Sequence, residues 1–141
     1  MKKFFIGLIL GISLSVHAQD YAQTEFPPVE DKENELAYFV SFSIPEKQLV
    51  TLIRAAEHQK IPVYIRGLIH NDMKRTAKAI LYLAQKYNVQ GMLVDPLRFE
   101  HYDIQAVPAL VKKCGQKFDV IYGNVDLKQA LDLIANQGEC K

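Results

Sequence analysis

The sequence predicts an α/β domain in which helices pack on a mixed β-sheet of about five strands. Up to residue 94, three apolar segments rich in β-branched and aromatic residues alternate with two segments of helical periodicity. This alternation is typical of parallel strands joined by right-handed crossovers. Two further strand-like segments, residues 109–113 and 118–122, are separated by a connection of hairpin length. With a last helical segment after them, we expect three layers, α/β/α, with helices on both faces of the sheet.

The first 18 residues have the composition of a secretory signal peptide. Lys2 and Lys3 precede an apolar run that ends in the sequence Val16-His17-Ala18, and we expect cleavage after Ala18. The apolar run is shorter than the ~20 residues that cross a bilayer. The mature chain is therefore expected to be exported without inserting into the membrane.

The mature chain is predicted to consist of a leader and one domain. It carries 15 Lys and Arg against 16 Asp and Glu, a balance that argues against nucleic acid as the main partner. Residues 19–35 hold six acidic residues, one Lys and a Pro-Pro pair, which predicts an acidic, extended or disordered leader. The aromatic residues Tyr21 and Phe26 leave open that this leader docks on a partner. The length of residues 36–141 fits a single domain with its own core.

The first predicted strand, residues 36–42, is followed by a helix that extends to about Gln59. Ser43 and Glu46 have the spacing of a capping box, and Pro45 is tolerated in a first helical turn. The capping role accounts for the Ser43 hydroxyl better than a role as nucleophile, because no base lies nearby in the sequence. The helix has one apolar stripe, formed by Leu49, Leu52, Ile53 and Ala56.

The next elements are a strand over residues 62–67, a helix capped by Asn71 or Asp72, and a strand over residues 91–94 that ends before Asp95-Pro96. The helix is recognised by the spacing of Met73, Ala77, Ile80, Leu81 and Ala84.

Arg66 and Asp95 are expected at the carboxyl ends of neighbouring strands, where open α/β sheets place their sites. They form either an anion-binding position or a structural ion pair, and the ion pair is favoured because no phosphate loop or nucleophile–base set lies nearby. His58, His70 and His101 lack the spacing of a metal site. We therefore expect neither a metal nor another cofactor.

Cys114 and Cys140 are the two cysteines of the chain. Export to an oxidising compartment favours a disulfide between them, which would stabilise the domain by roughly 3.5 kcal/mol in the chain-entropy estimate. A catalytic redox pair is the alternative, but such pairs are usually C-x-x-C at a helix start. The last helix is expected to begin at Asn124 or Asp126 and to end before Gly138, so the disulfide would join this helix to the hairpin.

The stretch YDIQAVPALV, residues 102–111, joins a turn to Val107-Pro108 and then to an apolar strand. Together with the order of strands and helices, it resembles the segment of the thioredoxin fold that carries a cis-proline. The resemblance implies that the backbone of Val107 is free to pair with an extended peptide.

The redox motif of that fold has no counterpart in this sequence. Residues 63–87 resemble the central strand and active-site helix, which places the C-x-x-C motif on His70, Asn71, Asp72 and Met73. A second registration, similar to that of bacterial disulfide isomerases, places the motif on Ser43 to Glu46. Because neither segment contains a cysteine, the resemblance implies a thioredoxin-like scaffold that lacks the CxxC motif.

A narrower resemblance covers most of the chain after the leader. The strings FVSFSIP, IRGL, DPLRF, IQAVPAL and YGNVDLKQAL, between residues 39 and 131, resemble the F-type conjugative pilus-assembly protein family TrbC. This resemblance implies a periplasmic protein of an F-like type IV secretion system, without known enzymatic activity, that works with a TraW-like partner. Members of that family often have a longer N-terminal region than the leader here.

We therefore expect a non-catalytic periplasmic assembly factor that supports conjugative pilus assembly by binding another protein. The expected binding edge consists of Val107, Pro108, His70 and Asn71. The alternatives are a thiol-disulfide oxidoreductase or isomerase that uses Cys114 with its partner cysteine, and a general periplasmic chaperone.

Overall fold

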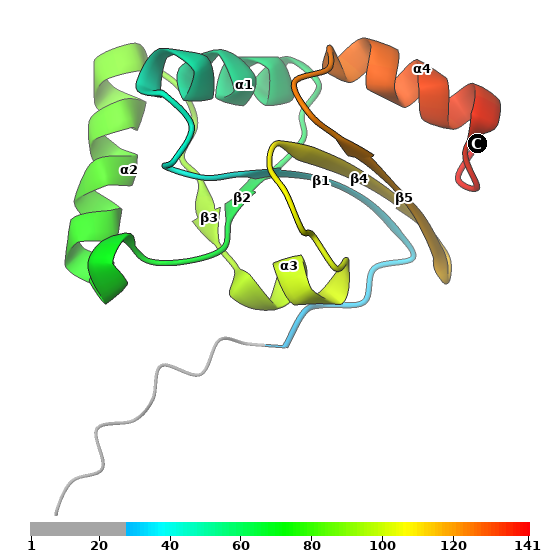
Figure 1. Ribbon diagram of the computed structural model, residues 1–141, viewed down its shortest axis with the longest axis horizontal. Helices are drawn as coiled ribbons and strands as arrows, with labels where there is room; N and C mark the ends of the chain where they lie inside the picture. Colours follow the sequence, from blue (N-terminus) through cyan, green and yellow to red (C-terminus); the bar gives the residue numbers. More distant parts are fainter. Residues whose placement is uncertain (1–27) are drawn as a thin grey trace, which may run out of the picture.

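The computed structural model describes residues 28–141 and contains a five-stranded sheet with four α-helices and one 3-10 turn (Figure 1). The expected signal peptide and most of the expected leader lie outside the described residues. The elements are β1 (Asn34–Val40), α1 (Glu46–His58), β2 (Val63–Ile65), the 3-10 turn η1 (Ile69–Asn71), α2 (Met73–Tyr87), β3 (Leu93–Val94), α3 (Pro96–His101), β4 (Ala109–Cys114), β5 (Lys117–Tyr122) and α4 (Leu127–Gln137).

The sheet is mixed, with the strand order β3-β2-β1-β4-β5. Strands β1, β2 and β3 are parallel, whereas β4 is antiparallel to both β1 and β5. Phe39 of β1 lies opposite Ala109 of β4, and Val40 lies opposite Ile65 of β2. This is the topology of the thioredoxin fold, so the predicted fold class is confirmed.

The helices form the two outer layers of the domain. In Figure 1, α1 and α4 lie above the sheet and α3 lies below it, and α2 contributes Leu83 to the same core as α1. Both crossovers, from β1 to β2 and from β2 to β3, step in the same direction along the sheet. Right-handed crossovers in one direction place their helices on one face, which leaves only α3 for the other face.

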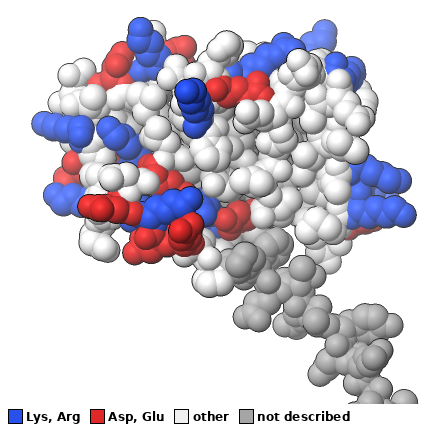
Figure 2. Space-filling model, turned by 180° about the vertical axis from the view of Figure 1, so that it is seen from behind, with Lys and Arg blue, Asp and Glu red and all other residues white. Residues whose placement is uncertain are grey.

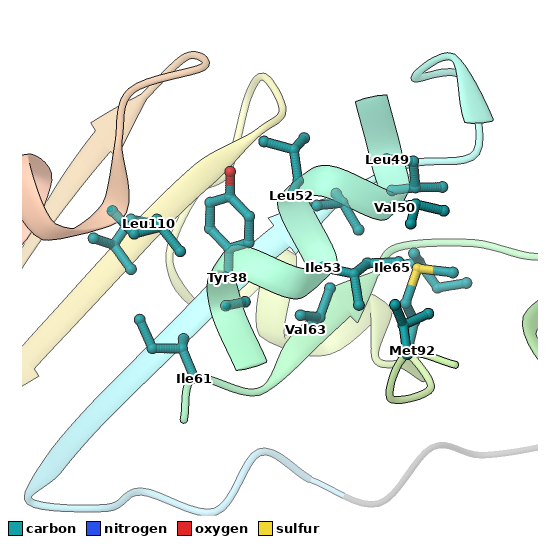
Figure 3. Close-up of a cluster of buried hydrophobic side chains, with 14 of the residues drawn as sticks. Tyr38, Leu49, Val50, Leu52, Ile53, Ile61, Val63, Ile65, Met92 and Leu110 are labelled. Atoms are coloured by element: carbon teal, nitrogen blue, oxygen red, sulfur yellow. The ribbon is translucent and has the colours of Figure 1, made fainter. Parts of the chain in front are cut away.

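The larger core lies between the sheet and α1, α2 and α4. The predicted apolar stripe of α1, formed by Leu49, Leu52, Ile53 and Ala56, is buried there. Figure 3 shows the ring of Tyr38 in this core, between α1 and Leu110 of β4. Burial of these side chains holds the helical layer on the sheet.

The smaller core lies between the opposite face of the sheet and α3. The Phe39 ring of β1 packs edge-on against the Phe99 ring, with 4.7 Å between the ring centroids. The centroid of the Tyr102 ring lies 6.2 Å from that of Phe39. Alternate residues of β1 therefore face different cores, as the pleat of a strand requires.

A buried ion-pair network fixes α3 against β1. The Arg98 guanidinium pairs with Glu35, with both side chains less than 10% exposed, and with Asp95 at 3.0 Å. Tyr102 donates its hydroxyl hydrogen to Glu35. Burial, and then the hydrogen bond to Glu35, raise the pKa of Tyr102.

Two helix starts differ from the prediction. Helix α1 begins at Glu46 with Pro45 in the cap position and no side-chain cap, because Ser43 instead donates its hydroxyl hydrogen to Ser41 Oγ at 3.0 Å. Helix α3 was not predicted: Asp95-Pro96 indicated the end of a strand, whereas Asp95 also caps the following helix by accepting from the Arg98 N–H at 2.9 Å.

The predicted disulfide is present between Cys114 and Cys140, with a Cα–Cα distance of 5.5 Å. It joins the end of β4 to the segment after α4. Asp119 of β5 holds the same segment by accepting hydrogen bonds from the backbone N–H groups of Glu139 and Cys140. Between residues 28 and 141, no helix is both long and apolar enough to span a membrane.

Candidate functional site

The candidate site lies around Pro108, which precedes β4 and follows a cis peptide bond from Val107. The register between β1 and β4, continued by two residues, places Val107 opposite Ser41. Within residues 28–141, the backbone N–H and C=O of Val107 have no hydrogen-bond partner. Unpaired backbone groups at the end of a strand are a template for an added strand.

Three shallow hollows lie side by side at this end of the sheet. They have volumes of about 160, 240 and 170 Å³. The first two share Arg66, and the last two share Phe42. The first is lined by Arg66, Phe99, Ile104, Gln105, Ala106 and Val107, the second by Ser41, Phe42 and residues 65–69, and the third by Phe42, Ile44, Glu46, Leu49, Ala79, Tyr82 and Leu83.

Arg66 separates the first hollow from the second. Its guanidinium donates to the carbonyl of Ile104 at 3.0 Å and lies 5.2 Å from the centre of the Phe99 ring. The predicted pair between Arg66 and Asp95 is therefore wrong. The reason is α3, which places Arg98 three residues after Asp95 and gives that carboxylate a nearer cation.

The topology decides between the two registrations of the redox motif. The strand that carries the cis-proline pairs with β1, so the equivalent of the active-site helix is α1 and the motif position is Ser43 to Glu46. His70 and Asn71 follow β2, one strand further away. They have left-handed backbone angles, with φ of 49° and 54°, and line none of the three hollows. The ladder of β1 with β4 ends at Phe39 opposite Ala109 and leads toward Ser41, whereas His70 follows the next strand, β2.

The motif position has no redox chemistry of its own. It contains a hydroxyl group, two aliphatic side chains and the Glu46 carboxylate, and both cysteines of the chain are joined in the disulfide between β4 and the C-terminal segment. Residues 28–141 also contain no group of His, Cys, Asp and Glu side chains that could hold a metal ion. The arrangement offers main-chain hydrogen bonds and apolar hollows, which suit the binding of a polypeptide.

A polar cluster borders the third hollow. Glu46 accepts hydrogen bonds from the Tyr87 hydroxyl and from Lys86 Nζ, the latter at 2.9 Å. These contacts, that of Tyr87 first, lower the pKa of Glu46. Lys86 also lies 4.9 Å from the centre of the Tyr82 ring. The Glu46 carboxylate at the hollow is therefore already matched by a cation.

Sequence reasoning missed the lining of the third hollow. One signal was available: residues 80–83 read Ile-Leu-Tyr-Leu, which is more apolar surface than one helical stripe needs. Leu83 faces the core, whereas Leu81 and Tyr82 remain 54% and 48% exposed. Tyr82 therefore places exposed apolar surface at the third hollow.

Comparison with known proteins places this scaffold in a family. Residues 38–134 match the family described as type-F conjugative transfer system pilin assembly protein, TrbC. The chain belongs to this family. The periplasmic protein TrbC of Escherichia coli (strain K12) is 44% identical over 104 residues, which cover 74% of this chain and 49% of that protein. The chain thus spans about half the length of this TrbC relative.

Solved structures with a similar chain trace include MTB DsbF, in its mixed oxidized and reduced forms, and StoA from Bacillus subtilis. MTB DsbF has a TM-score of 0.47 and 15% identity, over 74% of this chain and 80% of its own. StoA from Bacillus subtilis has a TM-score of 0.45 and 10% identity, over 71% and 81%. At these identities neither similarity bears on the activity of the TrbC-family chain.

Proposed function

We propose that this TrbC-family chain is a non-catalytic periplasmic assembly factor of an F-like conjugative type IV secretion system. In this proposal it is exported with cleavage after Ala18 and supports pilus assembly by binding another protein. Family membership and the periplasmic relative support this role. The observation that carries the binding function is the backbone N–H and C=O of Val107, which have no hydrogen-bond partner within residues 28–141 and lie just before β4.

The binding mode that fits this edge is strand addition. An extended segment of the partner would pair with the free N–H and C=O of Val107, and its side chains would enter the hollows on either side of Arg66. Main-chain hydrogen bonds then supply affinity, and the hollows supply selectivity. A TraW-like secretion protein is the partner we propose.

The test is capture of the partner from the periplasm with the tagged mature chain and its Val107→Pro variant. Proline at this position removes the N–H that would donate to the added strand. Loss of one such hydrogen bond, about 0.5–1.5 kcal/mol, predicts a two- to tenfold loss of captured TraW-like protein, with a parallel fall in pilus production.

The control is His70→Ala, which alters an exposed residue of the 3-10 turn η1 outside the three hollows. It is expected to leave capture unchanged. If Val107→Pro keeps the wild-type melting temperature and captures as much partner as the wild type, the edge is not the binding surface. Equal capture of many unrelated unfolded proteins would instead favour a general periplasmic chaperone.

A further inference from the structure

The third hollow has the form of an anchor pocket for one side chain. Its floor is apolar, formed by Phe42, Ile44 and Leu49 from the β1–α1 side and by Ala79 and Leu83 from α2. Tyr82, held in place by Lys86, forms its rim. At about 170 Å³ it is smaller than the ~300 Å³ at which small-molecule sites begin, and it suits a single large apolar side chain. We call it the α1–α2 pocket.

Positive charge flanks this pocket along α2. Lys78 is four residues before Tyr82, and Arg75 is four residues before Ala79, so these exposed cations lie on the same helix face as the lining residues. Neither of them takes part in an ion pair within residues 28–141. Figure 2 shows Lys and Arg side chains along the right-hand edge of the molecule, where α2 lies in that view.

The carboxylate of the pocket does not cancel this charge. Glu46 is the acidic residue of the lining, and Lys86 and Tyr87 already bond it. Asp72, the N-cap residue before α2, uses its carboxylate to accept from the Arg75 N–H at 3.0 Å. A ligand at this pocket therefore meets an apolar floor and a net positive flank.

We propose that the α1–α2 pocket binds an acidic segment of a partner protein through one large apolar side chain. The apolar side chain fills the pocket, and carboxylates beside it approach Arg75 and Lys78. Because the pocket shares Phe42 with the hollow next to the Val107 edge, one extended segment can engage both. This inference rests on the proposed function for the choice of a protein partner, and it adds the chemistry of the segment.

The first experiment measures binding of a fluorescent synthetic peptide of about ten residues with one central Phe between Asp and Glu residues. The expected result is saturable binding to the mature chain. Replacement of the Phe by Ala in the probe should weaken binding about tenfold or more, because the apolar contact is lost. Replacement of the acidic residues by Lys should weaken it about as much and reverse its salt dependence, because added salt then screens a repulsion.

Variants of the protein locate this binding. Ala79→Phe fills the pocket, and Tyr82→Ala removes its rim at an exposed position, so a folding defect in the first variant still leaves the second as a test. Each is expected to weaken probe binding about tenfold. Lys78→Glu should weaken it about threefold at low salt, whereas the matched reversal Lys128→Glu on α4 should leave it unchanged.

Several outcomes would overturn the proposal. Equal binding of the Phe and Ala probes, or equal loss with Lys78→Glu and Lys128→Glu, would exclude the pocket. Tighter binding after deletion of residues 19–27 would show that the acidic leader of the chain itself, with Phe26, is the occupant. Partner capture separates the two proposals. If Val107→Pro captures less partner and Ala79→Phe captures as much as the wild type, the edge is retained and the pocket is excluded. If only Ala79→Phe captures less partner, the pocket is retained and the edge is excluded.

Discussion

Replacement of Tyr38 by Phe is expected to stabilise this protein, the opposite of what most core substitutions do. Tyr38 is 1% exposed, and its hydroxyl has no hydrogen-bond partner within residues 28–141. The ring itself packs well in the larger core, between α1 and β4 (Figure 3). Phe keeps that ring and removes only the oxygen.

The size of the effect follows from the desolvation of the hydroxyl. A buried polar group without a partner costs about 1–3 kcal/mol. At pH 7 we therefore expect the free energy of unfolding of Tyr38→Phe to exceed that of the wild type by about 1 kcal/mol, which corresponds to a rise of about 4 °C in melting temperature for a domain of this size. Urea denaturation followed by circular dichroism measures the difference.

Alkaline pH supplies a second, independent measurement. Burial raises the pKa of Tyr38 to about 12 from 10.0. A raised pKa means that the protonated form of Tyr38 is favoured in the folded state. The contribution of Tyr38 to the free energy of unfolding of the wild type therefore keeps its full value below pH 10 and falls as the pH rises from 10 toward 12, because the unfolded chain loses the Tyr38 proton more readily. The gap between Tyr38→Phe and wild type should widen by about 1 kcal/mol between pH 9 and pH 11.

This reasoning would be refuted if Tyr38→Phe were less stable than the wild type at pH 7 by about 1 kcal/mol or more. A loss of that size is the contribution of a normal hydrogen bond. It would mean that the hydroxyl has a partner, such as a buried water molecule. Leu110→Ala, which removes packing from the same core, is the control: it should destabilise by about 2–5 kcal/mol at every pH.

Two further predictions concern bonds that hold the domain together. Replacement of Cys114 and Cys140 by Ser should lower the free energy of unfolding, measured by urea denaturation, by up to about 3.5 kcal/mol. In the wild type, thiol titration under mild reductant should detect a buried disulfide that resists reduction. A readily reduced pair would instead favour a thiol-disulfide enzyme. Arg98→Met should destabilise the domain by about 3–5 kcal/mol, because it leaves the Glu35 carboxylate buried without its cation. The double variant Arg98→Met/Glu35→Gln should recover a large part of this lost stability. If it recovers none, Arg98 acts by packing alone.

Periodicity and local chemistry predicted the long elements of this fold. The stripe of α1 was predicted from the sequence, and each helix cap was narrowed to two residues, of which Asp72 caps α2 and Asp126 caps α4, because these features depend on residues within one or two turns. Helix α3 was missed because its six residues are too few to show a helical period. Missing α3 also made the predicted Arg66–Asp95 pair wrong, because Arg98 of α3 pairs with Asp95 in its place.

The candidate site was harder to predict because it depends on strand neighbours. The segment around Val107-Pro108 was recognisable, but which helix faces it depends on whether β4 pairs with β1 or with β2. No local pattern encodes that choice, so the two registrations, at Ser43 and at His70, were equally consistent with the sequence. The antiparallel register of β1 with β4 decides for Ser43.

The position of Arg66 explains how a scaffold without cysteine at Ser43 to Glu46 can still present a defined surface. Its guanidinium ties the end of β2 to the carbonyl of Ile104 in the loop before the cis-proline, and it rests on the Phe99 ring of α3. Three segments that are distant in sequence are thus held in one arrangement before any ligand binds. Binding to such a preorganised edge loses little entropy on the side of the protein. In the proposed binding mode, the affinity of a partner then depends on how well its own segment matches the Val107 edge and the hollows beside it.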